Sequence, residues 1–184
     1  MTNMNFDELA QEAFATAKAH GWHDTEQPDE HWLMLIITEI AEAVQADRKD
    51  RHTDIGLFKA LLETYANDDA VFKYEFETHV KNGVEDELAD IIIRCLDYSA
   101  LRGICLDYVP IFITDYCRDK SIVKRDFPTF AYFLTFKAVN GDVTDVLARV
   151  IAYCKLKGID IDFFVEQKMR YNKLREYRHG NKKY

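Results

Sequence analysis

Two pairs of acidic residues, each three positions apart, lie in apolar stretches of this sequence. Glu39 and Glu42 occur in LMLIITEIAEAVQADR, and Glu87 and Asp90 occur in VEDELADIIIRCLDY. Residues i and i+3 lie side by side on a helix, about 5–6 Å apart at Cβ, so each pair can bind one hard cation or bracket two. Burying a carboxylate without a counter-charge costs several kcal/mol. We therefore expect these four carboxylates to bind a divalent metal.

The types of these side chains indicate which metal it would be. Sites built from carboxylate oxygens suit Mg²⁺ or Mn²⁺, whereas zinc prefers histidine or cysteine and di-iron bundles use Glu-x-x-His. The one Glu-x-x-His in the chain, Glu176 and His179, lies in a basic tail, and we interpret it as accidental. The alternative to a metal site is an ordinary charged helix. Residues 85–87 would then favour a helix N-terminus, and Asp90 would pair with Arg94.

Helical periodicity extends over nearly the whole chain, which has only seven glycines and three prolines in 184 residues. We predict an all-α fold, an antiparallel helical bundle, in a single domain spanning residues 1–184. Five consecutive apolar residues, 33–37, predict that the second helix is buried on all sides. The expected helices cover residues 6–20, 29–48, 55–65, 69–81, 84–101, 111–119, 128–139, 142–157 and 160–178.

Composition excludes some classes of function. The formal net charge of −8 argues against a general nucleic-acid binder, and no apolar stretch reaches the roughly 18 residues that a membrane span requires. The N-terminus has no basic segment followed by an apolar run, so we expect no signal peptide. The cysteines lack Cys-x-x-Cys spacing, and we expect them to be reduced core thiols of a cytoplasmic protein. They are Cys95, Cys105, Cys117 and Cys154.

The last seventeen residues are strongly basic in an otherwise acidic protein, which suggests an anionic ligand. Lys168, Asn172 and Arg175 have the spacing i, i+4 and i+7, so they share one helical face and could hold phosphate oxygens or a sugar hydroxyl. The alternative is a solvated helix end whose cations complement the helix dipole. Trp32 could stack on a base, but a tryptophan on this apolar face is more often part of the core.

A weak internal repeat relates two segments of the chain. ELADIIIRCLDYSALRGICLD, residues 87–107, aligns without a gap with DVTDVLARVIAYCKLKGIDID, residues 142–162, matching Asp90 to Asp145 and Gly103 to Gly158. Shared periodicity alone can produce such a match, so duplication and coincidence both stay open. If the chain is duplicated as a pseudo-dimer, residues 1–107 form the active half. Residues 108–184 are then a degenerate repeat, without the metal site, followed by the basic closing helix.

The order of these motifs resembles that of the MazG-like all-α nucleoside triphosphate pyrophosphohydrolases, a superfamily that includes the dimeric dUTPases and phosphoribosyl-ATP pyrophosphohydrolase. The similar features are Glu-x-x-Glu, Glu-x-x-Asp within ELAD, and a closing segment in which GIDID precedes Lys168, Asn172 and Arg175. The connections are longer than usual, both between Glu42 and Glu87 and after residue 107. The closing helix is therefore expected to reach the site of the first half, and the inserted helices could cap the pocket.

The resemblance implies an activity and residue roles. The four acids would bind Mg²⁺, or Mn²⁺ in its place, and Glu39 or Glu42 would orient or deprotonate the attacking water. The enzyme would cut a nucleoside triphosphate between the α and β phosphates, giving the monophosphate and pyrophosphate. Substrate contacts would come from Lys168, Asn172 and Arg175.

These residues are also compatible with other functions. A catalytically silent helical module could bind RNA or another polyanion through the basic tail, and the same metal site could act on a phosphoribosyl nucleotide instead. The apolar faces of the helical pairs need a second pair to cover them. Either the second half of the chain or a homodimer would supply it.

Overall fold

The computed structural model describes residues 5–65 and 68–178. Within these ranges the secondary structure consists of helices, without a β-strand. The prediction of an all-α fold is therefore confirmed for the described residues. The α-helices are α1 (Phe6–Ala19), α2 (Asp29–Arg48), α3 (Ile55–Tyr65), α4 (Asp69–His79), α5 (Val84–Arg102), α6 (Val109–Asp119), α7 (Phe127–Val139), α8 (Val143–Lys157) and α9 (Ile161–Lys173), with a short 3-10 helix η1 (Ser121–Val123) after α6.

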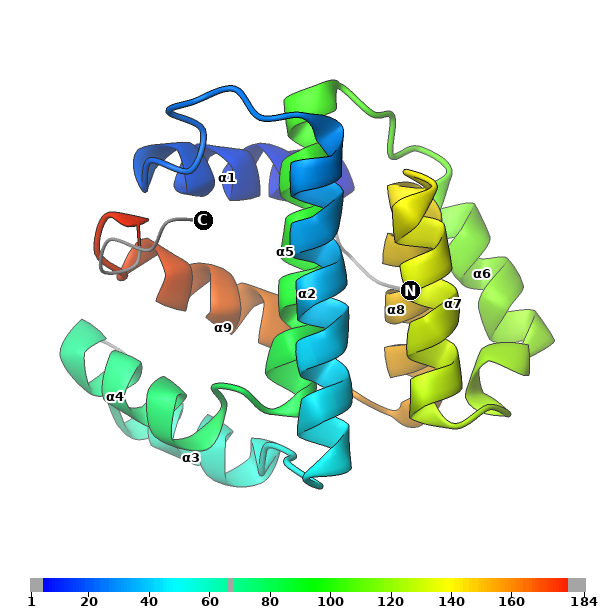
Figure 1. Cartoon of the computed structure of the whole chain (residues 1–184). Helices are drawn as coiled ribbons and strands as arrows, with labels where there is room; N and C mark the ends of the chain where they lie inside the picture. The colour runs from blue at the N-terminus through cyan, green and yellow to red at the C-terminus, as the bar shows by residue number, and fades with distance from the viewer. Residues whose placement is uncertain (1–4, 66–67, 179–184) are drawn as a thin grey trace.

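The helix α5 is the centre of the fold. It packs against α1, α2, α8 and α9, and Figure 1 shows it beside α2 in the middle of the molecule. Most of its residues are buried, including Ile91, Ile92 and Leu96. The helices α1, α9, α3 and α4 lie on one side of this central pair, and α6, α7 and α8 lie on the other (Figure 1).

The helix contacts follow the order of the two aligned segments. The helix α1 packs on α5, and α6 packs on α8; across the middle, α2 packs on α7 and α5 on α8. Both α5 and α8 end at a glycine in the left-handed conformation, Gly103 with φ 65° and Gly158 with φ 74°. These are the two glycines that the sequence alignment matched.

The last helix ends earlier than predicted. Its expected end was residue 178, but α9 ends at Lys173, because the chain that follows turns back onto the loop after α1. Arg178 donates its backbone N–H to the carbonyl of His20 at 3.0 Å. Gly21, with φ 79°, leaves room for the Tyr177 ring, since a Cβ atom there would lie 2.3 Å from it. The other predicted helix bounds agree with the structure to within about two residues.

Two further expectations about burial are only partly correct. Trp32 lies in the core, as predicted, and Ile36 is fully buried. However, Met34 is 55% exposed, so α2 is not buried on all sides; no described helix covers its front face in Figure 1. Cys95 and Cys154 are buried free thiols, one in α5 and one in α8.

The other cysteines depart from the prediction of core thiols. Cys105 is exposed, because it lies in the loop after α5, and Cys117 in α6 is half-buried; both are free. Among the described residues, no helix is long and apolar enough to cross a membrane.

Candidate functional site

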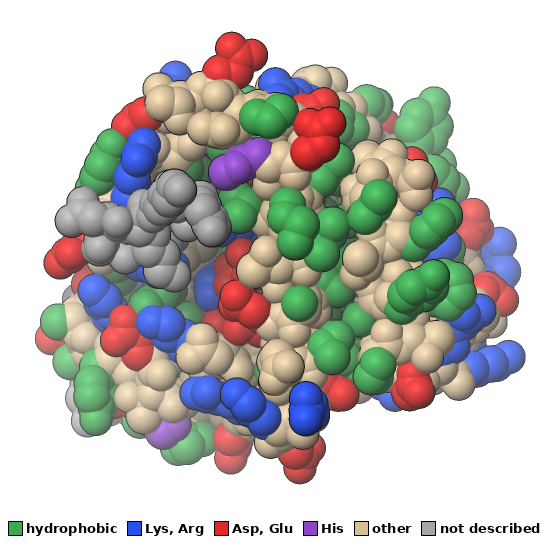
Figure 2. All heavy atoms as spheres, in the orientation of Figure 1, with side chains coloured by type: hydrophobic (Ala, Val, Ile, Leu, Met, Phe, Trp, Pro, Cys, Tyr) green, Lys and Arg blue, Asp and Glu red, His purple; other side chains and the backbone are tan. Residues whose placement is uncertain are grey.

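A cavity of about 270 Å³ lies between α1, α2, α5 and α9. Figure 2 shows acidic and basic side chains together in the hollow beside α2. Both signs of charge line the cavity, and the predicted residues from the first half and from the closing segment meet there. The acidic residues are Glu39, Glu42, Asp86, Glu87, Asp90 and Asp97, and the lysines and arginines are Lys81, Arg94, Lys168 and Arg175.

Three of the four predicted metal ligands converge. Glu39 and Glu42 lie one turn apart on α2, and Glu87 lies in the first turn of α5, which packs on α2. One carboxylate oxygen from each of the three lies within 4.8 Å of the others. Two ligands of one Mg²⁺ can be at most about 4.2 Å apart, so a small inward movement would let them share one ion. This set of hard oxygen donors fits Mg²⁺ or Mn²⁺.

The fourth predicted ligand, Asp90, lies outside this group of three. Its Oδ2 is 2.6 Å from Lys168 Nζ, and the same ammonium is 2.7 Å from Asp86 Oδ1. Lys168 is only 4% exposed. Burial lowers the pKa of Lys168, but the adjacent Asp90 and Asp86 outweigh burial and raise that pKa above its ordinary value. The lysine therefore stays cationic and neutralises two carboxylates of α5.

Glu39 also has a cationic neighbour. Arg94 Nε donates to Glu39 Oε1 at 3.0 Å, so the arginine of α5 pairs across to α2 rather than with Asp90 on its own helix. Burial and the nearby Asp90 raise the pKa of Glu39 to about 7, against the opposing effect of Arg94. The carboxylate is thus only partly compensated.

Glu87 is the buried carboxylate without a cation. It is 3% exposed, and within the described ranges its side chain has no hydrogen bond or ion pair. Burial, and then the neighbouring Asp90 and Asp86, raise the pKa of Glu87 to about 9. A carboxylate that is buried beside two others is a place where a divalent cation would relieve the repulsion.

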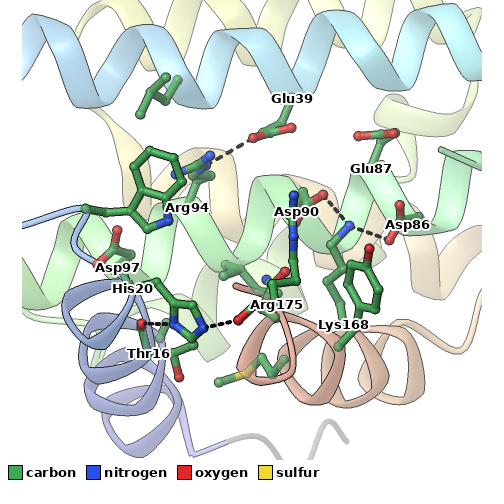
Figure 3. A pocket seen from close by; sticks show the side chains of 18 of the residues that line it. Thr16, His20, Glu39, Asp86, Glu87, Asp90, Arg94, Asp97, Lys168 and Arg175 are labelled. Atoms are coloured by element: carbon green, nitrogen blue, oxygen red, sulfur yellow. Dashed lines mark hydrogen bonds and ion pairs between the residues drawn. The ribbon is translucent and has the colours of Figure 1, made fainter. Parts of the chain in front are cut away.

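The predicted substrate residues line the same cavity, although Arg175 lies beyond the end of α9. Figure 3 shows Arg175 between Lys168 and His20. Its backbone carbonyl lies 2.9 Å from His20 Nε2, which ties it to α1. In the described part of the chain, the Arg175 guanidinium makes no salt bridge, and Asn172 Oδ1 is buried without a hydrogen-bond partner. Both side chains therefore keep bonding capacity for a ligand.

Sequence reasoning missed several residues of the cavity. Asp86 and Arg94 entered only the alternative to a metal site, as a helix-terminus acid and as a partner of Asp90, whereas both line the cavity. Asp97 was not singled out at all. The missing signal was the spacing of Asp86, Asp90, Arg94 and Asp97 at i, i+4, i+8 and i+11, which places all four on one face of α5.

The position that the sequence alignment matches to Asp90 has different surroundings. Asp145, the counterpart of Asp90, accepts a hydrogen bond from Arg149 Nε at 2.9 Å and lies 3.2 Å from Lys137 Nζ. The Tyr116 hydroxyl also donates to Asp145. Cations of α7 and α8 therefore neutralise this aspartate.

No protein-family model, curated protein or solved structure matches this chain. The residues of the cavity and their geometry are therefore the basis for a functional assignment.

Proposed function

We propose that this protein is a MazG-like nucleoside triphosphate pyrophosphohydrolase that depends on Mg²⁺, with Mn²⁺ as a possible substitute. The observation that carries the proposal is the cluster of Glu39, Glu42 and Glu87 in a cavity that Lys168 and Arg175 also line. Hard oxygen ligands beside cationic side chains suit a metal-bound polyphosphate.

The charges of the cavity explain why a metal is needed. A triphosphate carries three to four negative charges, and the carboxylate end of the cavity would repel it. A bound Mg²⁺ or Mn²⁺ would reverse the local sign, polarise the α-phosphoryl group and neutralise charge on the leaving pyrophosphate. Glu39 or Glu42 would orient the attacking water or accept its proton. Asp90 completes the ligand set once Lys168 moves away from it.

The closing segment would hold the phosphates. Arg175 offers a planar guanidinium suited to bidentate contact with phosphate oxygens, and Asn172 offers an amide beside it. Lys168 would move its ammonium from Asp86 and Asp90 to the substrate, so the same cation would serve the site with and without metal.

We also infer that the chain is an internally duplicated pseudo-dimer. Its support is the pairing of α2 with α7 and of α5 with α8, together with the matched terminal glycines Gly103 and Gly158. In this proposal the first half carries the chemistry, and the second half, whose Asp145 is neutralised by Arg149 and Lys137, is a scaffold.

The alternative function is a silent module that binds RNA through the basic tail. Apart from Arg175, the cations of the tail that the structure describes are engaged with carboxylates: Lys168 with Asp86 and Asp90, Arg170 with Asp69, Lys173 with Glu12, and Arg178 with Asp24. Lys182 and Lys183 lie outside the described residues, as does His179. This pairing favours the enzyme, because a polyanion site needs uncompensated positive charge.

The bond that is cut tests the proposal. We expect ³¹P NMR of a nucleoside triphosphate incubated with the protein and Mg²⁺ to show a monophosphate and pyrophosphate. A diphosphate and inorganic phosphate would contradict the assignment. RNA binding that weakens steeply with salt and needs no metal would instead support the silent module.

The role in nucleotide metabolism also implies a cytoplasmic protein, in line with the four free cysteines.

A further inference from the structure

The cavity contains one more buried carboxylate, at the end remote from the metal cluster. Asp97 lines the cavity and is 4% exposed. It follows Asp90 by seven residues, two turns of α5 and about 10 Å along the helix axis. Figure 3 shows Asp97 on the side of His20, with Glu87 at the opposite end. The cavity therefore has two acidic ends, and Arg94 lies between them.

One oxygen of Asp97 is held in place and the other is free to bind a ligand. His23 Nε2 lies 2.8 Å from Asp97 Oδ1. The His23 side chain is 6% exposed, and its ring lies between those of Phe14 and Trp32, with both centroid distances 4.7 Å. Asp97 Oδ2 has no hydrogen-bond donor among the described residues and is not one of their fully buried atoms, so it is accessible from the cavity. It keeps its capacity to accept a hydrogen bond from a ligand.

The position of Asp97 matches one part of a nucleotide. Two turns of helix are comparable to the span from the α-phosphorus of a nucleotide to the Watson–Crick edge of its base. If the phosphates lie at Glu87 and Asp90, the edge of the base reaches Asp97. Apolar side chains also line the cavity, among them Leu35 and Ile93, and such walls suit the faces of a base.

We propose that Asp97 binds the exocyclic amino group of the base and makes the protein selective for nucleotides of cytosine or adenine. This inference rests on the proposed function. An ionised carboxylate only accepts hydrogen bonds. The N4 amino group of cytosine and the N6 amino group of adenine donate them. Uracil and hypoxanthine carry a carbonyl oxygen at the same position, which would face Asp97 Oδ2 lone pair to lone pair.

His23 is a positioning residue in this proposal. An ionised Asp97 requires the imidazole to donate from Nε2, which fixes the tautomer and the rotation of the carboxylate. Its packing against Phe14 and Trp32 keeps it there. The acceptor is thus directed into the cavity before a base arrives.

Matched nucleotide pairs test the inference. We would measure kcat/KM for pyrophosphate release with Mg²⁺ on dCTP against dUTP and on dATP against dITP, since each pair differs at the position that Asp97 reads. We expect the amino member to be favoured about tenfold or more in each pair that is hydrolysed, because a buried acceptor facing a carbonyl loses its bond. A ratio near one, or a preference for the carbonyl member, would overturn the inference.

Substitution assigns the selectivity to Asp97. The Asp97→Asn variant presents an amide that can donate to a carbonyl, so we expect its ratio to fall to about one or to invert. As a control for loss of a partly buried carboxylate, Asp145→Asn lies in the second half and should keep the wild-type ratio. An Asp97→Asn protein that folds by circular dichroism and keeps the wild-type ratio would contradict the inference.

A second variant keeps the inference testable if Asp97→Asn does not fold. Asp97→Glu keeps the charge beside His23 but shifts the acceptor by one methylene, so we expect loss of kcat/KM on dCTP and dATP and little change on dUTP and dITP. An equal loss on both members would overturn the role of Asp97. Absence of pyrophosphate release from every nucleotide would refute the proposed function itself, whereas hydrolysis without selectivity would refute this inference alone.

Discussion

Glu87 shows how a single residue can report a missing ligand. It is buried beside Asp86 and Asp90, and no described cation pairs with it. The sequence could predict that Glu87 and Asp90 form a carboxylate pair, because they are three residues apart on one helix. The pairing of Asp90 with Lys168 could not be predicted, because an ion pair between helices far apart in the chain depends on how α9 packs on α5.

The pKa values predict how metal binding depends on pH. The pKa of Glu87 is raised from 4.5 to about 9, and that of Glu39 from 4.5 to about 7. Between pH 4.5 and the raised pKa of each group, the folded, metal-free protein holds a proton that the unfolded chain has lost. The stability that these two groups contribute therefore falls as the pH rises. A divalent metal needs the ionised forms. We expect the affinity for Mn²⁺ to rise from pH 6 to pH 9, by up to about tenfold per pH unit for each proton released.

Calorimetric titration at several pH values would measure this affinity, and thermal unfolding of the metal-free protein would measure the opposite trend in stability. The Glu87→Gln variant is the control, because it removes the group with the highest pKa of the cluster and should flatten the loss of stability between pH 7 and pH 9. Affinity that is independent of pH would contradict a metal site at these carboxylates.

At the scale of elements, the bounds of most helices could be predicted, because glycines and changes of periodicity are local signals. Gly103 and Gly158 both end their helices as expected. The end of α9 could not be predicted, since the tertiary contacts of Tyr177 and Arg178 with the loop after α1 override the helical pattern. Arg175 still lines the cavity from this turn, although it lies beyond the end of the helix.

The docking of α9 on α5 depends on one buried cation. We expect Lys168→Met to lower the free energy of unfolding of the metal-free protein by about 3–5 kcal/mol, because Asp86 and Asp90 then face each other without a counter-charge. Chemical denaturation would measure this change, and added Mn²⁺ should recover part of it.

The matched control is Lys173→Met on the same helix, whose partner Glu12 is on the surface. We expect this substitution to lower the free energy of unfolding by about 0–1 kcal/mol. Equal effects of the two substitutions would argue against a buried charge network.

At the scale of the whole molecule, residues 1–107 and 108–184 both contribute to one continuous core. The long segment between Glu42 and Glu87 has a structural role. The inserted α3 and α4 pack on each other, and α4 also contacts α9, where Tyr171 donates to Glu77 at 2.7 Å. A homodimer stays a prediction. Figure 2 shows apolar side chains along α7 at the surface, where such a contact would form. The exposed apolar residues of α7 are Tyr132, Phe133, Phe136 and Val139.

A metal bound by the carboxylate cluster would be required for hydrolysis of the nucleotide in our proposal. The most direct measurement is the rate of pyrophosphate release from a panel of nucleoside triphosphates with Mg²⁺ and with EDTA, for the wild type and for Glu87→Gln. We predict release with Mg²⁺ only, lowered by about 100-fold or more in the variant, because the metal stabilises the developing charge by several kcal/mol. Release that persists in EDTA, or an unimpaired Glu87→Gln protein, would contradict the proposal.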